Sequence, residues 1–210
     1  MTHHLFLLRH GTTEWIEARR VQGSSDSPLT ERGRDEARQA LMSLAGITFD
    51  AVFCSPMGRT RETAAIVCAE LGIEPVFLDD LREMDFGRYE GYAYIDPQQG
   101  ELTAKMKINL FIKMVLAQIT GESMRQVKQR AWRAWQSMLE NCPHGTVLII
   151  AHGVILNALL AHLMPVNEYR KIRTVQLKPC SLTEILVADT GHADLLRLDD
   201  CRHLGNSKVS

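Results

Sequence analysis

Arg9 and His10 stand side by side at the end of an apolar run, in the segment LFLLRHG (5–11). Such a pair is either the ordinary polar end of a buried strand or part of a site that binds an anion. A guanidinium offers a rigid fork of N–H donors that matches a phosphate or a carboxylate. An imidazole can carry a proton or act as a nucleophile. The pair therefore raises the question of an anion site, which the other segments must answer.

Two further apolar runs end in residues of the same kind. TVLIIA (146–151) runs directly into His152 and Gly153, and AVFC (51–54) leads into Arg59. In open α/β sheets, ligands bind outside the carboxyl ends of the strands. Helix N-termini at such places offer free backbone N–H groups and a positive dipole end, which suit a phosphate. Each residue alone has an ordinary explanation, but their convergence on one sheet edge favours an anion pocket.

A phosphate pocket that carries out hydrolysis needs a nucleophile, cations for the phosphoryl oxygens and an acid for the leaving group. His10 can be the nucleophile when it is neutral, and nearby cations disfavour its protonated form. The segment LREMDFGRYEG offers three carboxylates, Glu83, Asp85 and Glu90. Glu83 is favoured as the acid because it lies nearest the end of a strand predicted at 74–78, with Asp85 close behind.

The elements that must position these groups alternate between strands and helices. Apolar positions at helical spacing predict a helix within 29–46, and Ser55 followed by Pro56 predicts the start of a helix that runs towards Gly72. A capping-box pattern at Ser123 predicts the start of another helix. Short apolar segments predict strands at 5–8, 51–54, 74–78 and 146–151, and a closing hairpin at 181–187 and 193–198.

This alternation predicts an α/β fold, a three-layer sandwich with a mostly parallel sheet flanked by helices. The 210 residues are expected to form one domain, 1–210, because the chain shows no internal repeat and no linker. The stretch 92–120 fits the alternation least well, since it is apolar with scattered lysines. Its simplest interpretation is an inserted helical cap over one end of the sheet. An amphipathic helix that seeks a membrane surface is the alternative.

Composition narrows the class of protein. The formal net charge is −1, so no global basic field recruits nucleic acid or a membrane surface, and neither partner is expected. The five cysteines are scattered without CxxC or Cys/His ligand spacing, so neither a disulfide framework nor a structural zinc site is expected. The N-terminal segment lacks the pattern of a signal peptide. A reduced, cytoplasmic protein is therefore expected.

Four segments, LRHGTTEW, SPMGRTRETA, REMDFGRYEG and IIAHGVI, resemble in this order the motifs of the histidine phosphatase superfamily, also called phosphoglycerate mutase-like. The Arg-His-Gly motif alone is weak, but the four together are highly specific. The resemblance implies that His10 is the phosphorylated nucleophile and that Glu83 is the proton donor. It also implies a phosphate clamp of Arg9, Arg59 and His152, with Gln22, Gly23 and Gly153 at the rim of the pocket.

In one place the sequence departs from the family pattern. Members often carry Asn six residues beyond the nucleophile, where it helps to hold phosphate, and here that position is Ile16. One lost hydrogen bond to a charged group is worth ~1.5–3 kcal/mol. Such a loss weakens phosphate binding or narrows specificity, and it leaves room for a more apolar substrate.

The motifs predict a metal-independent phosphomonoesterase that hydrolyses a small phosphorylated metabolite through a phosphohistidine. No metal and no cofactor are expected, because side chains neutralise the phosphate and no Asp/His ligand cluster stands out. A phosphoglycerate mutase-type phosphotransferase is the alternative within the family, since the same phosphohistidine can return its phosphate to a sugar acid. The short chain and the modest cap resemble the phosphatase members of the family more than the longer glycolytic mutases, so the phosphatase is favoured. A weakly active phosphate-binding regulatory protein is a third hypothesis, to which only Ile16 points.

A cysteine-dependent phosphatase is the nearest rival chemistry, because Cys54 precedes Arg59. That chemistry requires a Cys-x5-Arg loop, and here only four residues intervene. Cys54 is better interpreted as a buried strand residue. The sequence leaves the physiological substrate and the oligomeric state open.

Overall fold

The centre of the molecule is a six-stranded sheet in the order β3-β2-β4-β1-β5-β6. The computed structural model describes residues 2–93, 120–188 and 193–205. The strands β3, β2, β4 and β1 are parallel, whereas β5 and β6 are antiparallel to their neighbours. Their bounds are β1 Thr2–Arg9, β2 Ala51–Cys54, β3 Val76–Phe77, β4 Gly145–Ala151, β5 Leu182–Ala188 and β6 Ala193–Asp200. The mostly parallel sheet and the closing hairpin predicted from the sequence are thus confirmed.

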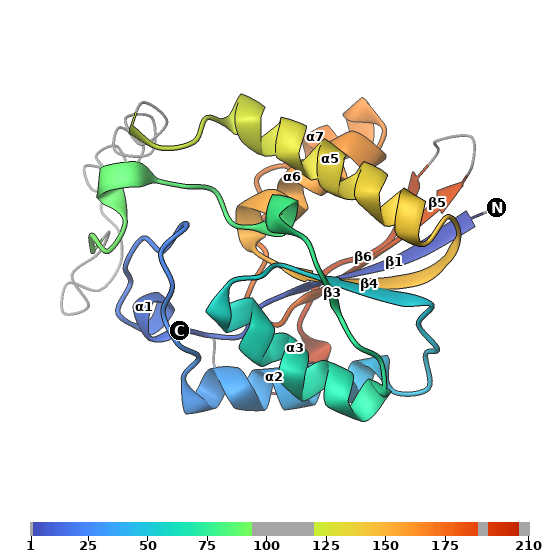
Figure 1. Ribbon diagram of the computed structural model, residues 1–210, viewed down its shortest axis with the longest axis horizontal. Helices are drawn as coiled ribbons and strands as arrows, with labels where there is room; N and C mark the ends of the chain where they lie inside the picture. The colour runs from blue at the N-terminus through green and yellow to red at the C-terminus, as the bar shows by residue number, and fades with distance from the viewer. Residues whose placement is uncertain (1, 94–119, 189–192, 206–210) are drawn as a thin grey trace.

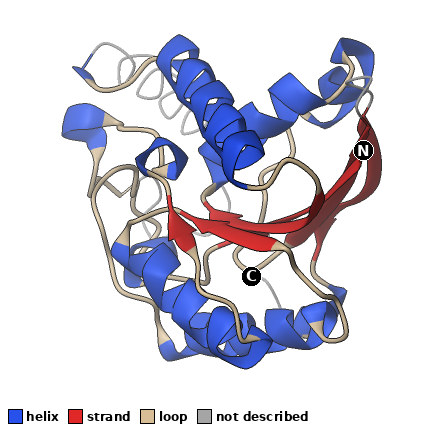
Figure 2. Ribbon diagram, turned by 45° about the vertical axis from the view of Figure 1, so that its right-hand side comes forward, coloured by secondary structure: helices blue, strands red, loops and turns tan. Residues whose placement is uncertain are grey.

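Helices cover both faces of this sheet, so the fold is the predicted three-layer sandwich (Figures 1 and 2). One layer holds α2 (Glu31–Leu44) and α3 (Gly58–Leu71), and the other holds α5 (Met124–Asn141), α6 (Gly153–Leu163) and α7 (Val166–Ile172). The short elements are α1 (Glu14–Glu17) and the 3-10 turns η1 (Asp79–Leu81), η2 (Gly87–Tyr89) and η3 (Arg202–Leu204).

The two faces of β1 carry two separate apolar cores. Leu5 and Leu7 pack in the cluster that contains the inner faces of α5 and α6. Phe6 and Leu8 pack in the other cluster, with residues of α2 and α3. Because successive strand residues point to opposite faces, a strand buried on both sides is apolar throughout, as this segment is.

The register between β1 and β4 determines which residues lie side by side at the carboxyl ends of these strands. Arg9 is paired with Ala151, and the N–H of His10 donates to the carbonyl of Ala151 over 3.0 Å. The residues that follow the two strands, His10 and His152, are therefore neighbours. The parallel pairing thus explains why two distant His-Gly motifs converge.

The predicted start of α3 is wrong. Ser55 does not cap this helix, which begins at Gly58 with Met57 as its N-cap residue. The backbone N–H groups of Gly58 and Arg59 instead donate to the carboxylate of Asp26, which reaches them from a distant loop. A carboxylate at a helix N-terminus satisfies donors that have no partner within the helix. A residue far away in the sequence thus took the place of the local cap.

Two other sequence predictions concern the strand at 74–78 and the cap at 92–120. The strand predicted at 74–78 is reduced to Val76 and Phe77. Most of the cap predicted at 92–120 lies outside the described residues and stays a prediction.

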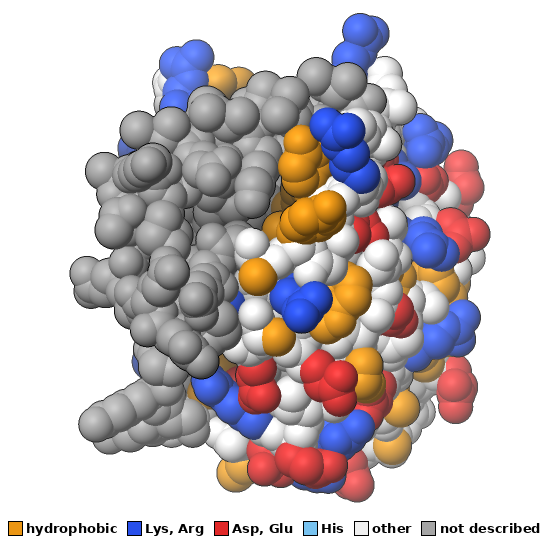
Figure 3. Space-filling view, turned by 90° about the vertical axis from the view of Figure 1, so that its left-hand side faces the viewer, with side chains coloured by type: hydrophobic (Ala, Val, Ile, Leu, Met, Phe, Trp, Pro, Cys, Tyr) orange, Lys and Arg blue, Asp and Glu red, His pale blue; other side chains and the backbone are white. Residues whose placement is uncertain are grey.

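In the part of the chain that the structure describes, no helix is long and apolar enough to cross a membrane. On the face drawn in Figure 3, acidic and basic side chains alternate over the described surface, in keeping with the near-zero net charge.

Candidate active site

His10 follows β1 and is 2% exposed. Its Nδ1 lies 2.8 Å from the carbonyl oxygen of Gly11. Since a carbonyl oxygen can only accept, Nδ1 carries the proton of the neutral ring. The other ring nitrogen, Nε2, then holds a lone pair, which is the form that a nucleophile requires.

The surroundings of His10 favour its neutral form. Burial lowers the pKa of His10 well below 6.5, and the charges of Arg59 and Arg9 lower it further, against the smaller opposing effect of the hydrogen bond to Gly11. Desolvation and like charge both disfavour an imidazolium. The ring is therefore neutral near pH 7, as the sequence predicted for a nucleophile next to cations.

His152 lies beside His10, with 5.1 Å between the ring centroids. The Nε–H of Arg59 donates to Nδ1 of His152 over 3.1 Å, so the proton of a neutral His152 is on Nε2, which lies 2.8 Å from Oγ of Ser55. Burial is the main reason why the pKa of His152 is well below 6.5, and the charge of Arg59 adds to it. Both histidines are thus held as neutral rings in defined tautomers.

Arg59 is a buried cation, 1% exposed, in the first turn of α3. Its Nη2 donates to the carbonyl of Gly23 over 2.7 Å, and its Nη1 donates to the carbonyl of Ser25 over 2.9 Å and to Oδ1 of Asp26 over 3.1 Å. Burial lowers the pKa of Arg59, while the charges of Glu83 and Asp26 act in the opposite direction. These contacts fix the guanidinium next to the two histidines.

Arg9 is the last residue of β1, and its side chain lies beside the start of α6. A Cβ built on Gly153 would stand in ordinary contact with the Cζ atom of Arg9, at 3.9 Å. The Nη1 group of Arg9 donates to the carbonyl of Leu177. Arg9 and Arg59 both lower the pKa of His10, so the two cations of the predicted clamp act on the same ring.

Two of the predicted rim residues, Gln22 and Gly23, lie on the loop between β1 and α2, and the third, Gly153, begins α6. The Oε1 atom of Gln22 accepts from the hydroxyl of Thr13 over 3.1 Å, and Gly23 has a φ of +58°. The half-buried Ile16 sits in α1, where its N–H donates to the same Thr13 hydroxyl over 3.3 Å. Its apolar side chain offers no donor to a phosphate. The departure noted in the sequence thus falls within the same loop.

Glu83 joins the site through the N-terminus of α6. Its carboxylate accepts from the backbone N–H of Val154 over 3.1 Å and of Ile155 over 3.2 Å, and also from that of Met84 over 2.9 Å. The first N–H groups of a helix have no partner within it, so an acidic side chain is favoured there. Val154 and Ile155 lie two and three residues after His152, the N-cap residue of α6, so the Glu83 carboxylate is bound at the start of the helix that follows this histidine.

The other two candidate acids are engaged elsewhere. Glu90 accepts from the backbone N–H and the hydroxyl of both Ser24 and Ser25, and from the N–H of Phe86 over 3.0 Å. These hydrogen bonds lower the pKa of Glu90 against the effect of burial, so its carboxylate stays ionised. Asp85 accepts from the N–H of Gly87 in its own turn, over 2.6 Å. This placement favours Glu83 as the acid and gives Glu90 a structural role.

The sequence did not single out Ser55, Asp26, Glu90 or Arg130 as supports of the site. Ser55 contacts His152, and Asp26 contacts Arg59. A polar residue just after a strand and an acidic residue in the 22–28 loop were visible signals, but their partners lie more than thirty residues away. Long-range contacts of this kind have no local pattern.

A cysteine mechanism finds no support in the structure. Cys54 is fully buried, and burial raises the pKa of its thiol. A nucleophilic cysteine needs an accessible thiolate. Within the described ranges, no group of three His, Cys, Asp or Glu side chains could hold a metal ion.

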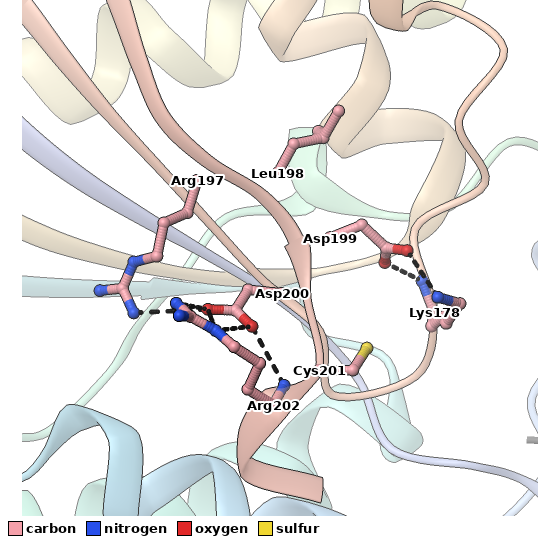
Figure 4. A pocket seen from close by; sticks show the side chains of 7 residues that line it. All are labelled: Lys178, Arg197, Leu198, Asp199, Asp200, Cys201 and Arg202. Carbon is pink, nitrogen blue, oxygen red and sulfur yellow. Dashed lines mark hydrogen bonds and ion pairs between the residues drawn. The ribbon is translucent and has the colours of Figure 1, made fainter. Parts of the chain in front are cut away.

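A second polar depression lies at the end of β6, and Figure 4 shows its side chains. Its basic groups pair with carboxylates: Lys178 with Asp199 at 3.3 Å, and both Arg197 and Arg202 with Asp200 at 3.7 and 2.7 Å. None of the predicted site residues lines it. Arg197 also pairs with Glu184, so each of the three cations has a carboxylate partner. The pair of Lys178 and Asp199 joins β6 to the loop before β5.

Comparison with known proteins matches the site to a family. The sequence pattern of the histidine phosphatase superfamily (branch 1) matches residues 5–200. A relative from Serratia proteamaculans, "Probable phosphoglycerate mutase GpmB", is 36% identical over 185 residues, which cover 86% of this chain and 83% of the relative. The structure of YhfR from Bacillus stearothermophilus is 32% identical and superimposes with a TM-score of 0.79 over 96% of this chain and 99% of that one.

A more distant structure shares the fold alone. The alpha-ribazole phosphatase from Shigella flexneri is 24% identical, with a TM-score of 0.76 over 94% of this chain and 96% of that one. The sheet and the helical layers thus belong to an architecture shared with YhfR and with a protein named as a phosphatase. On the match over residues 5–200 and the identity to these relatives, the chain belongs to the histidine phosphatase superfamily.

Proposed function

We propose that the protein is a metal-independent phosphomonoesterase that hydrolyses a small phosphorylated metabolite through a phosphohistidine on His10. One observation carries the proposal. The ring of His10 is buried and neutral, with Nδ1 bound to a carbonyl, and it lies between two arginines and beside His152. A lone pair on Nε2 within a cationic pocket is what an attack on a phosphate ester needs.

The first step forms a bond between Nε2 of His10 and phosphorus and breaks the ester bond. Arg9 and Arg59 hold the phosphoryl oxygens, and His152 joins them when its Nε2–H donates to a phosphoryl oxygen in place of Oγ of Ser55. Four of the five N–H groups of Arg59 donate to described residues, so the fifth, on Nη2, faces no such partner and suits a phosphate oxygen. Glu83, in its protonated form, gives its proton to the departing oxygen, which leaves as an alcohol. Positioning and charge supply the rate enhancement.

The second step releases phosphate. Glu83, now a carboxylate, takes a proton from a water molecule, and the water oxygen attacks phosphorus as the bond to Nε2 breaks. The neutral His10 is restored and Glu83 is protonated again. The contacts of Glu83 with α6 support this assignment, because they hold its carboxylate next to His152.

A phosphoglycerate mutase-type phosphotransferase is the second candidate. The observation that favours it is the identity of 31% and 36% to relatives named as probable phosphoglycerate mutases. A mutase would use the same phosphohistidine but return the phosphoryl group to a hydroxyl of a sugar acid instead of water. The two candidates therefore share His10 and Glu83 and differ in the acceptor.

Hydrolysis of p-nitrophenyl phosphate with excess EDTA tests the proposal. Wild type should release p-nitrophenol, and His10→Ala should not. His144→Ala is the matched control, because that histidine is exposed and precedes β4, at the opposite end of the strand from His152. Activity that survives in His10→Ala would contradict the mechanism. If wild type interconverts 2- and 3-phosphoglycerate faster than it releases phosphate from either, the mutase is the correct function.

A further inference from the structure

Arg130 of α5 binds the segment that carries Glu83. Its side chain is 13% exposed, and it forms a two-point ion pair with Glu122: Nε donates to Oε1 over 2.9 Å and Nη2 to Oε2 over 2.6 Å. Such a forked pair fixes the plane of the guanidinium as well as its position. Glu122 itself is largely buried, so water weakens this pair only slightly.

The remaining N–H groups of Arg130 point to backbone carbonyls that precede the acid. Nη1 donates to the carbonyls of Asp80, over 3.0 Å, and of Arg82, and Nη2 donates to that of Glu83 over 3.4 Å. All five N–H donors of the guanidinium thus have partners. A single side chain thus donates to three backbone carbonyls within four residues. This backbone is irregular and has no regular pattern of backbone hydrogen bonds that would hold it in place.

Glu83 is consequently held at both ends. Arg130 holds its carbonyl, and the N-terminus of α6 holds its carboxylate. The turn η1, which leads to Glu83, packs against α5, and Figure 1 shows the two side by side. The position of the acid relative to His10 therefore depends on α5 through one guanidinium.

We propose that Arg130 is a positioning residue for the proton donor: it sets where the Glu83 carboxylate stands and does not itself touch the substrate. This inference rests on the proposed role of Glu83. Lysine at this position keeps the charge but has three donors on one atom, so it cannot bind Glu122 and three separate carbonyls together. Arg130→Lys is thus a conservative change that removes the fork.

The test compares two esters of similar shape, p-nitrophenyl phosphate and phenyl phosphate. Nitrophenolate departs readily as an anion, whereas phenolate needs a proton much more. Loss of general acid catalysis costs 10²–10⁴-fold, so a misplaced acid in Arg130→Lys should lower kcat/KM for phenyl phosphate by about tenfold or more. The kcat/KM for p-nitrophenyl phosphate should fall by less than about threefold. This parameter covers the steps up to departure of the alcohol, so the role of Glu83 as base in the second step, which both esters share, does not enter it. Glu83→Gln should show the same selectivity in a stronger form.

Arg133→Lys is the matched control on the same helix. Arg133 is 58% exposed and pairs with the side chain of Asp80 over 2.7 Å, so it contacts no carbonyl of the acid segment. This variant should behave as wild type with both esters. Equal losses with both esters in Arg130→Lys, or no loss with either, would overturn the proposal.

Hydrogen exchange gives a second readout that does not depend on catalysis. The N–H groups of Val154 and Ile155 lie in the first turn of α6, where Glu83 is their acceptor. Their exchange should be about tenfold faster in Arg130→Lys and unchanged in Arg133→Lys. Unchanged exchange in both variants overturns the proposal. If wild type hydrolyses neither ester, the proposed function fails, and this exchange measurement alone decides the role of Arg130.

Discussion

The Nε–H of Arg59 donates to Nδ1 of His152 over 3.1 Å, which joins the first turn of α3 to the residue that follows β4. This hydrogen bond determines which nitrogen of His152 carries the proton. It also places a buried cation next to the histidine pair, where the charge of Arg59 lowers the pKa of both rings. The contact therefore fixes geometry and protonation together.

Arg59→Lys should disable the phosphate site although it keeps the positive charge. A lysine has no planar fork with which to contact His152 and the loop carbonyls of Gly23 and Ser25 at once. Loss of one oriented donor to a transition state costs ~10²–10³-fold, so kcat/KM for p-nitrophenyl phosphate should fall by about 100-fold. Steady-state kinetics of wild type and Arg59→Lys with p-nitrophenyl phosphate measures this fall in kcat/KM.

Arg61→Lys is the control for that substitution. Arg61 lies on the same helix, and its guanidinium stacks over the ring of Phe77 at 3.9 Å, away from the histidines. Its kinetics should match wild type within about twofold. An Arg59→Lys variant that behaves as Arg61→Lys does would show that the fork is not required.

The strand ends and the two His-Gly motifs were predictable because parallel strands place their carboxyl ends at one edge. Glu83 was favoured as the acid because it was expected nearest this edge; its carboxylate contacts the N-terminus of α6, and its role as the acid stays a prediction. The N-terminal start of α3 was not predictable, because its cap is Asp26, a residue from another loop. Local patterns describe helices and strands, whereas a side chain that crosses between loops leaves no periodic signal.

The stability of the protein should fall as the pH drops below about 6.5. Burial and the neighbouring cations lower the pKa of His10 and His152 in the folded state, whereas both take up protons near 6.5 when unfolded. Below that pH the unfolded chain binds more protons, so acid favours unfolding, by up to about 1.4 kcal/mol per pH unit for each histidine. Above about pH 7.5 this contribution is constant.

Urea unfolding between about pH 7.5 and pH 5 measures this dependence. His152→Gln should reduce the slope of the free energy of unfolding against pH, because one titrating group is removed. Met42→Ala, at an exposed position of α2, removes no titrating group and is the control that should leave the slope unchanged. A slope that is identical in wild type and His152→Gln would contradict the lowered pKa of His152.

Glu90→Gln should loosen the loop that carries Gly23 while the chemistry survives. The carboxylate accepts hydrogen bonds from Ser24 and Ser25, and weakening these costs about 1–2 kcal/mol in stability. Because Arg59 binds the carbonyls of this loop, KM should rise several-fold more than kcat falls. Asp85→Asn, which affects only a local turn, is the control.

The selectivity between esters distinguishes the two possible roles of Glu90. If Glu90 were the proton donor, its amide variant would lose kcat for phenyl phosphate far more than for p-nitrophenyl phosphate. If Glu90 has only a structural role, the ratio of the variant's kcat to that of wild type should be similar for both esters. Thermal unfolding of the same variant should show a lowered Tm.

Gly33→Ala should destabilise the protein although alanine normally favours a helix by about 1 kcal/mol over glycine. A Cβ on Gly33, in the first turn of α2, would stand 2.0 Å from the carbonyl oxygen of Thr12. That clash would displace the loop after His10, at a cost of about 1–3 kcal/mol. Met42→Ala, at an exposed position of the same helix, is the control. A Gly33→Ala variant as stable as wild type would show that the loop can move without cost.

The most direct test of the central claim is to trap the phosphoenzyme. Wild type is mixed with p-nitrophenyl phosphate, quenched in alkali and digested, and the peptides are examined by mass spectrometry. One acid-labile, alkali-stable phosphoryl group is expected on the peptide that contains His10, and none is expected in His10→Asn. A phosphoryl group on any other residue, or full turnover by His10→Asn, would contradict it.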